Sequence, residues 1–85
     1  MKYPVAIEMG EDSAWSAIVP DFPGCFSAAD DGLEELIKQC KEAMHLWVEH
    51  AIESGESIPS PSSIQEQSLN KEFDGYSWIE IELVL

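Results

Sequence analysis

Basic residues are scarce in this sequence. Its 85 residues include 4 Lys and Arg against 17 Asp and Glu, for a net charge of −13. A chain with this charge repels nucleic acid phosphates and anionic lipid, and it attracts basic partners. The composition therefore disfavours direct nucleic acid binding and membrane-surface binding.

Cysteines and long apolar runs are also scarce. The two cysteines, Cys25 and Cys40, form neither a disulfide framework nor a CxxC metal knuckle, which favours reduced thiols. The first residues lack the apolar run of a signal peptide, and no stretch reaches the roughly 20 apolar residues of a membrane span. From the reduced thiols and the missing signal peptide and membrane span we expect a cytoplasmic protein.

Glycine-rich phosphate-binding loops are missing as well.

The apolar content of 45% predicts a folded body, and 85 residues allow one domain over residues 1–85. Residues 2–9 alternate, with Tyr3, Val5, Ile7 and Met9 on one face, as in a half-buried strand. The pattern predicts further strands at 15–19, 25–28 and 76–85, a helix from residue 33 to before Gly55, and a loop with one helical turn at 64–76. The fold class is then α+β, a two-layer βββαβ sandwich with sheet order 3-2-1-4. A crossover through the helix would make the last strand parallel to its neighbour.

Two prolines and a glycine bend the segment between the second and third strands. Pro20 cannot donate to a strand ladder, and Pro23-Gly24 suits the centre of a type II turn. Asp30 or Asp31 is expected to cap the helix that follows.

The helix is predicted to be amphipathic. Its apolar stripe consists of Leu33, Leu36, Ile37, Cys40, Ala43, Met44, Trp47, Val48 and Ala51. The opposite face carries Glu35, Gln39, Glu42, Glu49 and Glu53, with Leu46 projecting among them. An exposed leucine of this kind is ordinary unless a partner covers it.

The sequence patterns that would indicate a metal site or a catalytic nucleophile are weak. His45 and His50 are separated by about 140° around the helix, whereas metal ligands on one helix face need a spacing of three or four residues. The sequence places no base beside Cys25, which reads as a small apolar residue at a strand. Glu8 with Glu80 or Glu82 would form a divalent-metal pair on adjacent strands, although such pairs arise by chance among 17 carboxylates.

The order of motifs resembles the HicB family of antitoxins over nearly the whole chain. The resemblance rests on the first strand, the run Val19-Pro20-Asp21-Phe22-Pro23-Gly24-Cys25, and the segment Gly55-Glu56-Ser57-Ile58-Pro59-Ser60-Pro61. It implies a partial RNase H-like fold and a non-enzymatic antitoxin that needs no cofactor or metal. It also implies a partner, a small basic HicA-type mRNA-cleaving toxin whose active site is covered. Many members carry a C-terminal segment that binds operator DNA. The resemblance assigns operator binding to no residue of this chain.

Charge and shape point to the outer helix face and the bent loop as the toxin-binding surface. The candidate contacts are Asp21, Phe22, Glu35, Glu42, Leu46 and Glu49. A homodimer or higher homo-oligomer is expected, because an edge strand invites pairing. The alternatives are a metal-dependent RNase H-like nuclease using carboxylates such as Glu8 and Glu82, and an acidic dimeric binding module without a toxin partner.

Overall fold

The structure, a computed structural model, describes residues 1–84. Its elements are strands β1 (Lys2–Met9), β2 (Trp15–Ile18) and β3 (Phe26–Ala29), helix α1 (Leu33–Glu53), the short helix α2 (Ile64–Gln67), the 3-10 turn η1 (Lys71–Phe73) and strand β4 (Ser77–Glu82). The predicted strands and helix are therefore confirmed, with the third strand one residue later and the second and last strands shorter than predicted. Leu85, predicted as part of the last strand, lies outside the described residues.

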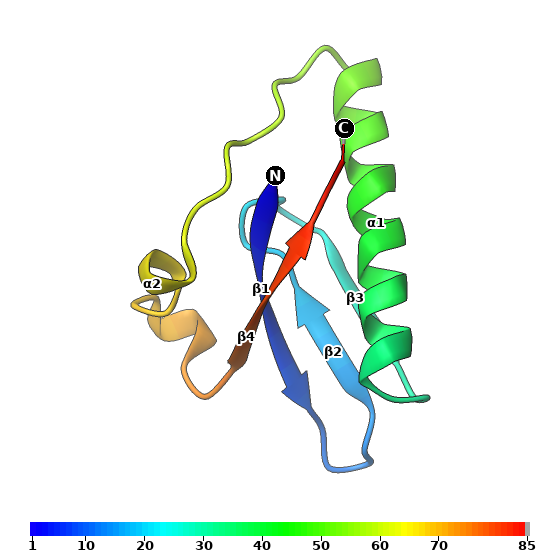
Figure 1. Ribbon diagram of the computed structural model, residues 1–85, viewed down its shortest axis with the longest axis vertical. Coiled ribbons are helices and arrows are strands. Elements are labelled where there is room, and N and C mark those ends of the chain that lie inside the picture. The colour runs from blue at the N-terminus through cyan, green and yellow to red at the C-terminus, as the bar shows by residue number, and fades with distance from the viewer. Residues whose placement is uncertain (85) are drawn as a thin grey trace.

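One sheet in the order β3-β2-β1-β4 carries α1 on one face, which confirms the predicted α+β architecture (Figure 1). All three strand pairs are antiparallel. The prediction of a parallel last strand was wrong. After α1 the chain runs back alongside the sheet to α2 and then turns into β4 (Figure 1). This return makes β4 antiparallel to β1, whereas a connection through the helix alone would make it parallel.

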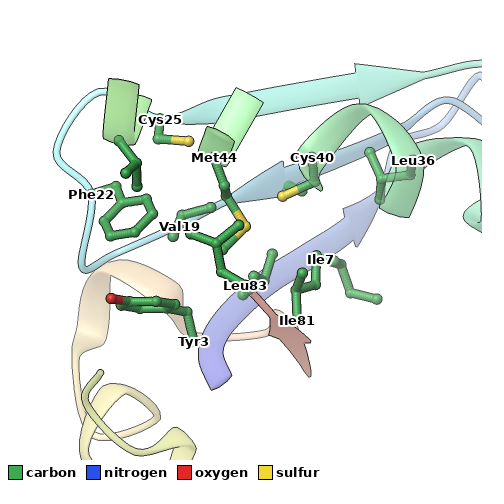
Figure 2. Close-up of a cluster of buried hydrophobic side chains, with 13 residues drawn as sticks. Tyr3, Ile7, Val19, Phe22, Cys25, Leu36, Cys40, Met44, Ile81 and Leu83 are labelled. Atoms are coloured by element: carbon green, nitrogen blue, oxygen red, sulfur yellow. The ribbon is translucent and has the colours of Figure 1, made fainter. Parts of the chain in front are cut away.

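The main core lies between the sheet and α1. Tyr3, Val5 and Ile7 of β1 are buried there, as their alternation predicted, whereas Met9 at the end of the strand is exposed. Figure 2 shows Tyr3 and Ile7 in one cluster with Leu36, Cys40 and Met44 of α1, together with residues of the bent segment and β4. The apolar stripe of the helix thus faces the sheet.

A smaller layer covers half of the other sheet face. Pro4 and Ala6 of β1 point away from α1 and are nevertheless fully buried. The α2 helix contacts β1 and β4, and Phe73 packs edge-on against Trp78 with ring centroids 5.6 Å apart. The segment predicted as a loop is therefore a packing element for β1 and β4.

The two ends of α1 differ in how they are capped. Neither Asp30 nor Asp31 caps the N-terminus, because Gly32 occupies the cap position with φ 104° and no side chain bonds there. At the C-terminus Gly55 has φ 75°. The Glu56 N–H donates to the Ala51 carbonyl at 2.8 Å, which completes a left-handed glycine cap.

Candidate functional site

The bent segment consists of two consecutive β-turns. The Phe22 N–H donates to the Val19 carbonyl at 3.1 Å, and the Cys25 N–H donates to the Phe22 carbonyl at 2.9 Å. Each turn has a proline, Pro20 or Pro23, at its second position, where the fixed φ of proline fits. In the second turn Gly24 supplies the positive φ, 83°, that a type II turn requires. The prolines and the glycine thus redirect the chain from β2 into β3.

The turns carry Phe22 into the core. Its side chain is 0% exposed and stacks on Trp47 with centroids 4.4 Å apart and planes 3° apart. Its other neighbour is Tyr3, at 4.6 Å. The Trp47 indole N–H also donates to the Pro23 carbonyl at 3.0 Å. Phe22 was therefore wrongly placed among the surface contacts, because burial removes its side chain from any partner's reach.

Asp21 bonds within the molecule. Its Oδ2 accepts from the Ser62 N–H at 2.9 Å and from the Ser62 hydroxyl at 3.0 Å. Nearby, the Tyr3 hydroxyl donates to the Pro59 carbonyl at 2.7 Å. These bonds tie the connector after α1 to the bent segment and to β1. The two proline-containing motifs that stand apart in the sequence are therefore one structural unit.

The outer face of α1 brings the remaining candidates together. Glu35, Glu42 and Glu49 recur every seven residues, so they share one side of the helix with a spacing of about 10 Å. Leu46 is 65% exposed and lies between Glu42 and Glu49 on that side. The Glu35 carboxylate accepts from the Gln39 side chain at 3.1 Å. We call Glu35, Glu42, Leu46 and Glu49 the acidic helix face.

An acidic hollow adjoins this face where β3 leads into α1. It is lined by Ala28, Ala29, Asp30, Asp31, Glu35 and Gln39. Sequence reasoning treated Asp30 and Asp31 only as helix caps and so missed their place at the surface. The signal was available, since these carboxylates lie within six residues of Glu35. Carboxylates on two sides of a hollow form a receptor for a basic side chain.

The carboxylates proposed for a metal site do not meet. In the antiparallel register Pro4 is opposite Glu80 and Lys2 is opposite Glu82, whereas Glu8 lies at the other end of β1. The Glu8 pair considered as an alternative does not form, because it required β4 to be parallel to β1. Within residues 1–84, no three His, Cys, Asp or Glu side chains gather to hold a metal ion.

Both cysteines are buried and unpaired. Burial raises the pKa of Cys25 to about 11, and the nearby Cys40 thiol adds to that increase. Burial also raises the pKa of Cys40, and the nearby Ser27 side chain acts in the opposite direction. Thiols of this kind stay protonated near neutral pH and are poor nucleophiles.

Across the part of the chain that the structure describes, no helix has the length and apolarity needed to cross a membrane.

Comparisons with known proteins place the chain in context. A family model described as the HicB-like antitoxin of a bacterial toxin–antitoxin system matches residues 3–85. An uncharacterized 14.9 kDa protein of Haemophilus phage HP1 is 41% identical over 71 residues; the match covers 84% of this chain but 51% of that protein, so this chain spans about half its length. A UPF0150 protein of Archaeoglobus fulgidus is 40% identical over 60 residues, covering 68% of this chain and 86% of the relative.

Solved structures share the fold. The N-terminal domain of the Burkholderia pseudomallei antitoxin HicB superposes with a TM-score of 0.87 at 30% identity, covering 100% of both chains. A chain in a structure described as the HicA3 and HicB3 toxin–antitoxin complex superposes with a TM-score of 0.75 at 24% identity, covering 96% of both chains.

Proposed function

The chain belongs to the HicB-like antitoxin family, and from this premise we propose that it binds and neutralises a small basic HicA-type mRNA-cleaving toxin by covering the toxin's active site. The observation that carries the proposal is the family match over residues 3–85. In this role the chain acts in the cytoplasm by binding alone and uses no cofactor. The HicA3 and HicB3 complex, in which a chain of this fold accompanies a HicA protein, supports the choice of partner.

Electrostatics support the acidic helix face as the docking surface. An enzyme that cleaves RNA must present positive charge to the phosphates of its substrate. Glu35, Glu42 and Glu49 line one side of α1, and Asp30 and Asp31 extend the negative charge toward β3. This surface attracts the toxin, orients it and occupies the ground that RNA would use. Leu46 supplies an apolar contact between the charges.

Charge at this surface contributes more to association than to stability. An exposed ion pair contributes about 0.2–1 kcal/mol, so three such pairs account for about 0.6–3 kcal/mol, roughly a 3- to 150-fold change in Kd. Salt weakens these contacts. We therefore expect toxin binding to weaken as ionic strength rises.

The test reverses charge on the acidic helix face and at matched positions elsewhere. The first variant is E35K/E42K/E49K. The control is E11K/E56K/E72K, at three exposed glutamates away from the outer face of α1. Both variants have a net charge of −7 instead of the −13 of the original chain.

The binding partner in this test is a small basic HicA-type toxin. The helix variant should bind it at least about tenfold more weakly and fail to restore growth when the two are co-expressed, whereas the control should do both nearly as well as the original chain. Equal losses in both variants would reject the acidic helix face as the docking surface. Failure of the unmodified chain to bind or protect would reject the antitoxin role.

A further inference from the structure

An open hollow of about 340 Å³ lies between α1 and the end of the bent segment, beside the acidic helix face. The α1 residues that line it are Ala43, Leu46, Trp47 and His50, and Phe26 lines it from the start of β3. We call it the Leu46 hollow. Because Leu46 also belongs to the acidic helix face, the hollow continues that face toward the bent segment.

Two large apolar residues are exposed at the Leu46 hollow. Leu46 is 65% exposed and Phe26 is 71% exposed, although they come from different elements. The residues that line the hollow, all between positions 24 and 50, include no Asp, Glu, Lys or Arg. A single exposed apolar residue is ordinary, whereas several around one concave surface are typical of a binding site.

The walls of the Leu46 hollow are held in place by the core. The Trp47 ring stacks on the buried Phe22 ring at 4.4 Å, and its indole N–H donates to the Pro23 carbonyl at 3.0 Å. On the other side, the Cys25 carbonyl accepts from the Val19 N–H at 3.0 Å. A surface that is already ordered costs little conformational entropy when a partner binds to it.

Carboxylates border the Leu46 hollow along α1. Leu46 follows Glu42 by four residues and precedes Glu49 by three, so both carboxylates lie beside it on the helix surface. An apolar centre with a polar rim is the usual anatomy of a protein interface. A negative rim favours an apolar side chain that is flanked by basic residues. A second copy of this chain, with its charge of −13, would instead bring carboxylates toward carboxylates.

We propose that the Leu46 hollow receives an apolar side chain of the toxin, one whose neighbours on the toxin surface are Lys or Arg. The proposal rests on the proposed antitoxin function and specifies how the toxin docks. The apolar side chain packs against Leu46, Trp47 and Phe26, and its basic neighbours pair with Glu42 and Glu49. The charges speed association, while the buried side chain slows dissociation.

The apolar and the charged parts of this surface should respond differently to salt. The Debye length falls from about 10 Å at 0.1 M salt to about 3 Å at 1 M, so attraction between charges is screened. Burial of an apolar side chain is not weakened in this way. The affinity lost through E35K/E42K/E49K should therefore shrink at high salt, whereas the loss caused by truncating Leu46 should keep its size.

Leu46→Ala is the first test, with Ile52→Ala as its matched control. Both residues lie on α1 and are similarly exposed, at 65% and 64%, but Ile52 does not line the hollow. Isothermal titration of each chain with a small basic HicA-type toxin, at about 0.1 M and 1 M salt, measures the affinity. Leu46→Ala should weaken binding at least about tenfold at both salt concentrations, and Ile52→Ala should leave it unchanged.

Ala43→Leu tests the hollow without removing a contact. Ala43 is half-buried and lines the hollow, so a larger apolar side chain there takes up the space that the toxin side chain needs. Leucine is a good helix former, and circular dichroism should show α1 intact. Toxin binding should nevertheless weaken at least about tenfold.

Nuclear magnetic resonance locates the contact directly. The indole N–H signal of Trp47 should shift when the toxin is added, because Trp47 lines the hollow. The indole signal of Trp78, which packs against Phe73 on β4, should stay in place.

The unmodified chain separates this proposal from the antitoxin role. If it does not bind the toxin, both proposals fail. If it binds, equal affinities of Leu46→Ala and Ile52→Ala, full affinity of Ala43→Leu, or an unshifted Trp47 signal would each overturn the docking of a toxin side chain in the Leu46 hollow alone. A Leu46→Ala chain that changes its sedimentation but keeps its toxin affinity would assign the hollow to a second copy and would also overturn the proposal.

Discussion

Phe22 offers a direct test of whether the bent segment is a core anchor or a contact surface. Replacing the fully buried ring with alanine removes about 2 kcal/mol of apolar burial. It also removes two aromatic pairs, with Trp47 and Tyr3, which contribute about 0.5–1.5 kcal/mol each. The free energy of unfolding should therefore fall by about 3–5 kcal/mol, within the usual range for a buried Phe→Ala change.

That loss is a large part of the total stability. At about 0.05–0.15 kcal/mol per residue, a chain of 85 residues unfolds with about 4–13 kcal/mol. Urea denaturation followed by circular dichroism of α1 measures the change. Phe26→Ala is the matched control, because it removes the same atoms from a side chain that is 71% exposed. At protein concentrations low enough to keep the chain monomeric, it should cost less than about 1 kcal/mol.

Equal costs at Phe22 and Phe26 would refute the packing argument. So would a Phe22→Ala protein that keeps its full stability and loses only toxin binding, because that result would place the ring on the surface. A Phe22→Leu protein should fall between, with a loss of about 1–2 kcal/mol that reflects the remaining apolar volume.

Three further changes probe the same fold. Asp21→Ala should lower the free energy of unfolding by about 1–2 kcal/mol, because the Ser62 N–H and hydroxyl lose their acceptor; Asp21→Asn, which keeps an acceptor oxygen, should lose less in the same denaturation assay. Gly24→Ala should cost about 1–2 kcal/mol by the same measurement, since φ is 83° and open space around the position leaves backbone strain as the cause. Stability should fall as pH rises from about 9 toward 11, because the unfolded Cys25 thiol ionises before the folded one, whose pKa is about 11; urea titrations at successive pH values should show a smaller fall for Cys25→Ala.

Much of the fold could be predicted from short-range patterns. Alternation in β1, the helical stripe from Leu36 to Ala51 and the Gly55 cap each act over a few residues, and all are present. The sheet order followed from hairpins between consecutive strands. The direction of β4 did not, because it depends on the path of residues 54–76 after α1. The N-cap also differed, because Gly32 took the position expected for an aspartate.

The candidate site was predicted in part. Exposure of Glu42, Leu46 and Glu49 follows from the helical period and agrees with the structure, whereas Glu35 is half-buried. The burial of Phe22 and the bonding of Asp21 to Ser62 could not be predicted from the bent run, since both depend on residues 19 or more positions away. The predicted sheet order placed the strand with Phe26 and Ala28 at an edge, and the structure confirms that order.

The sequence by itself determined the local conformations, the two proline turns and the excess of negative charge, because each depends on residue type and on neighbours within a few positions. Tertiary structure alone decided which side chains of the bent segment became anchors, which way β4 runs and which sheet edge stayed free. Those outcomes depend on how distant segments pack, and the returning connector places residues 58–76 against one half of the sheet and leaves the edge at β3 uncovered.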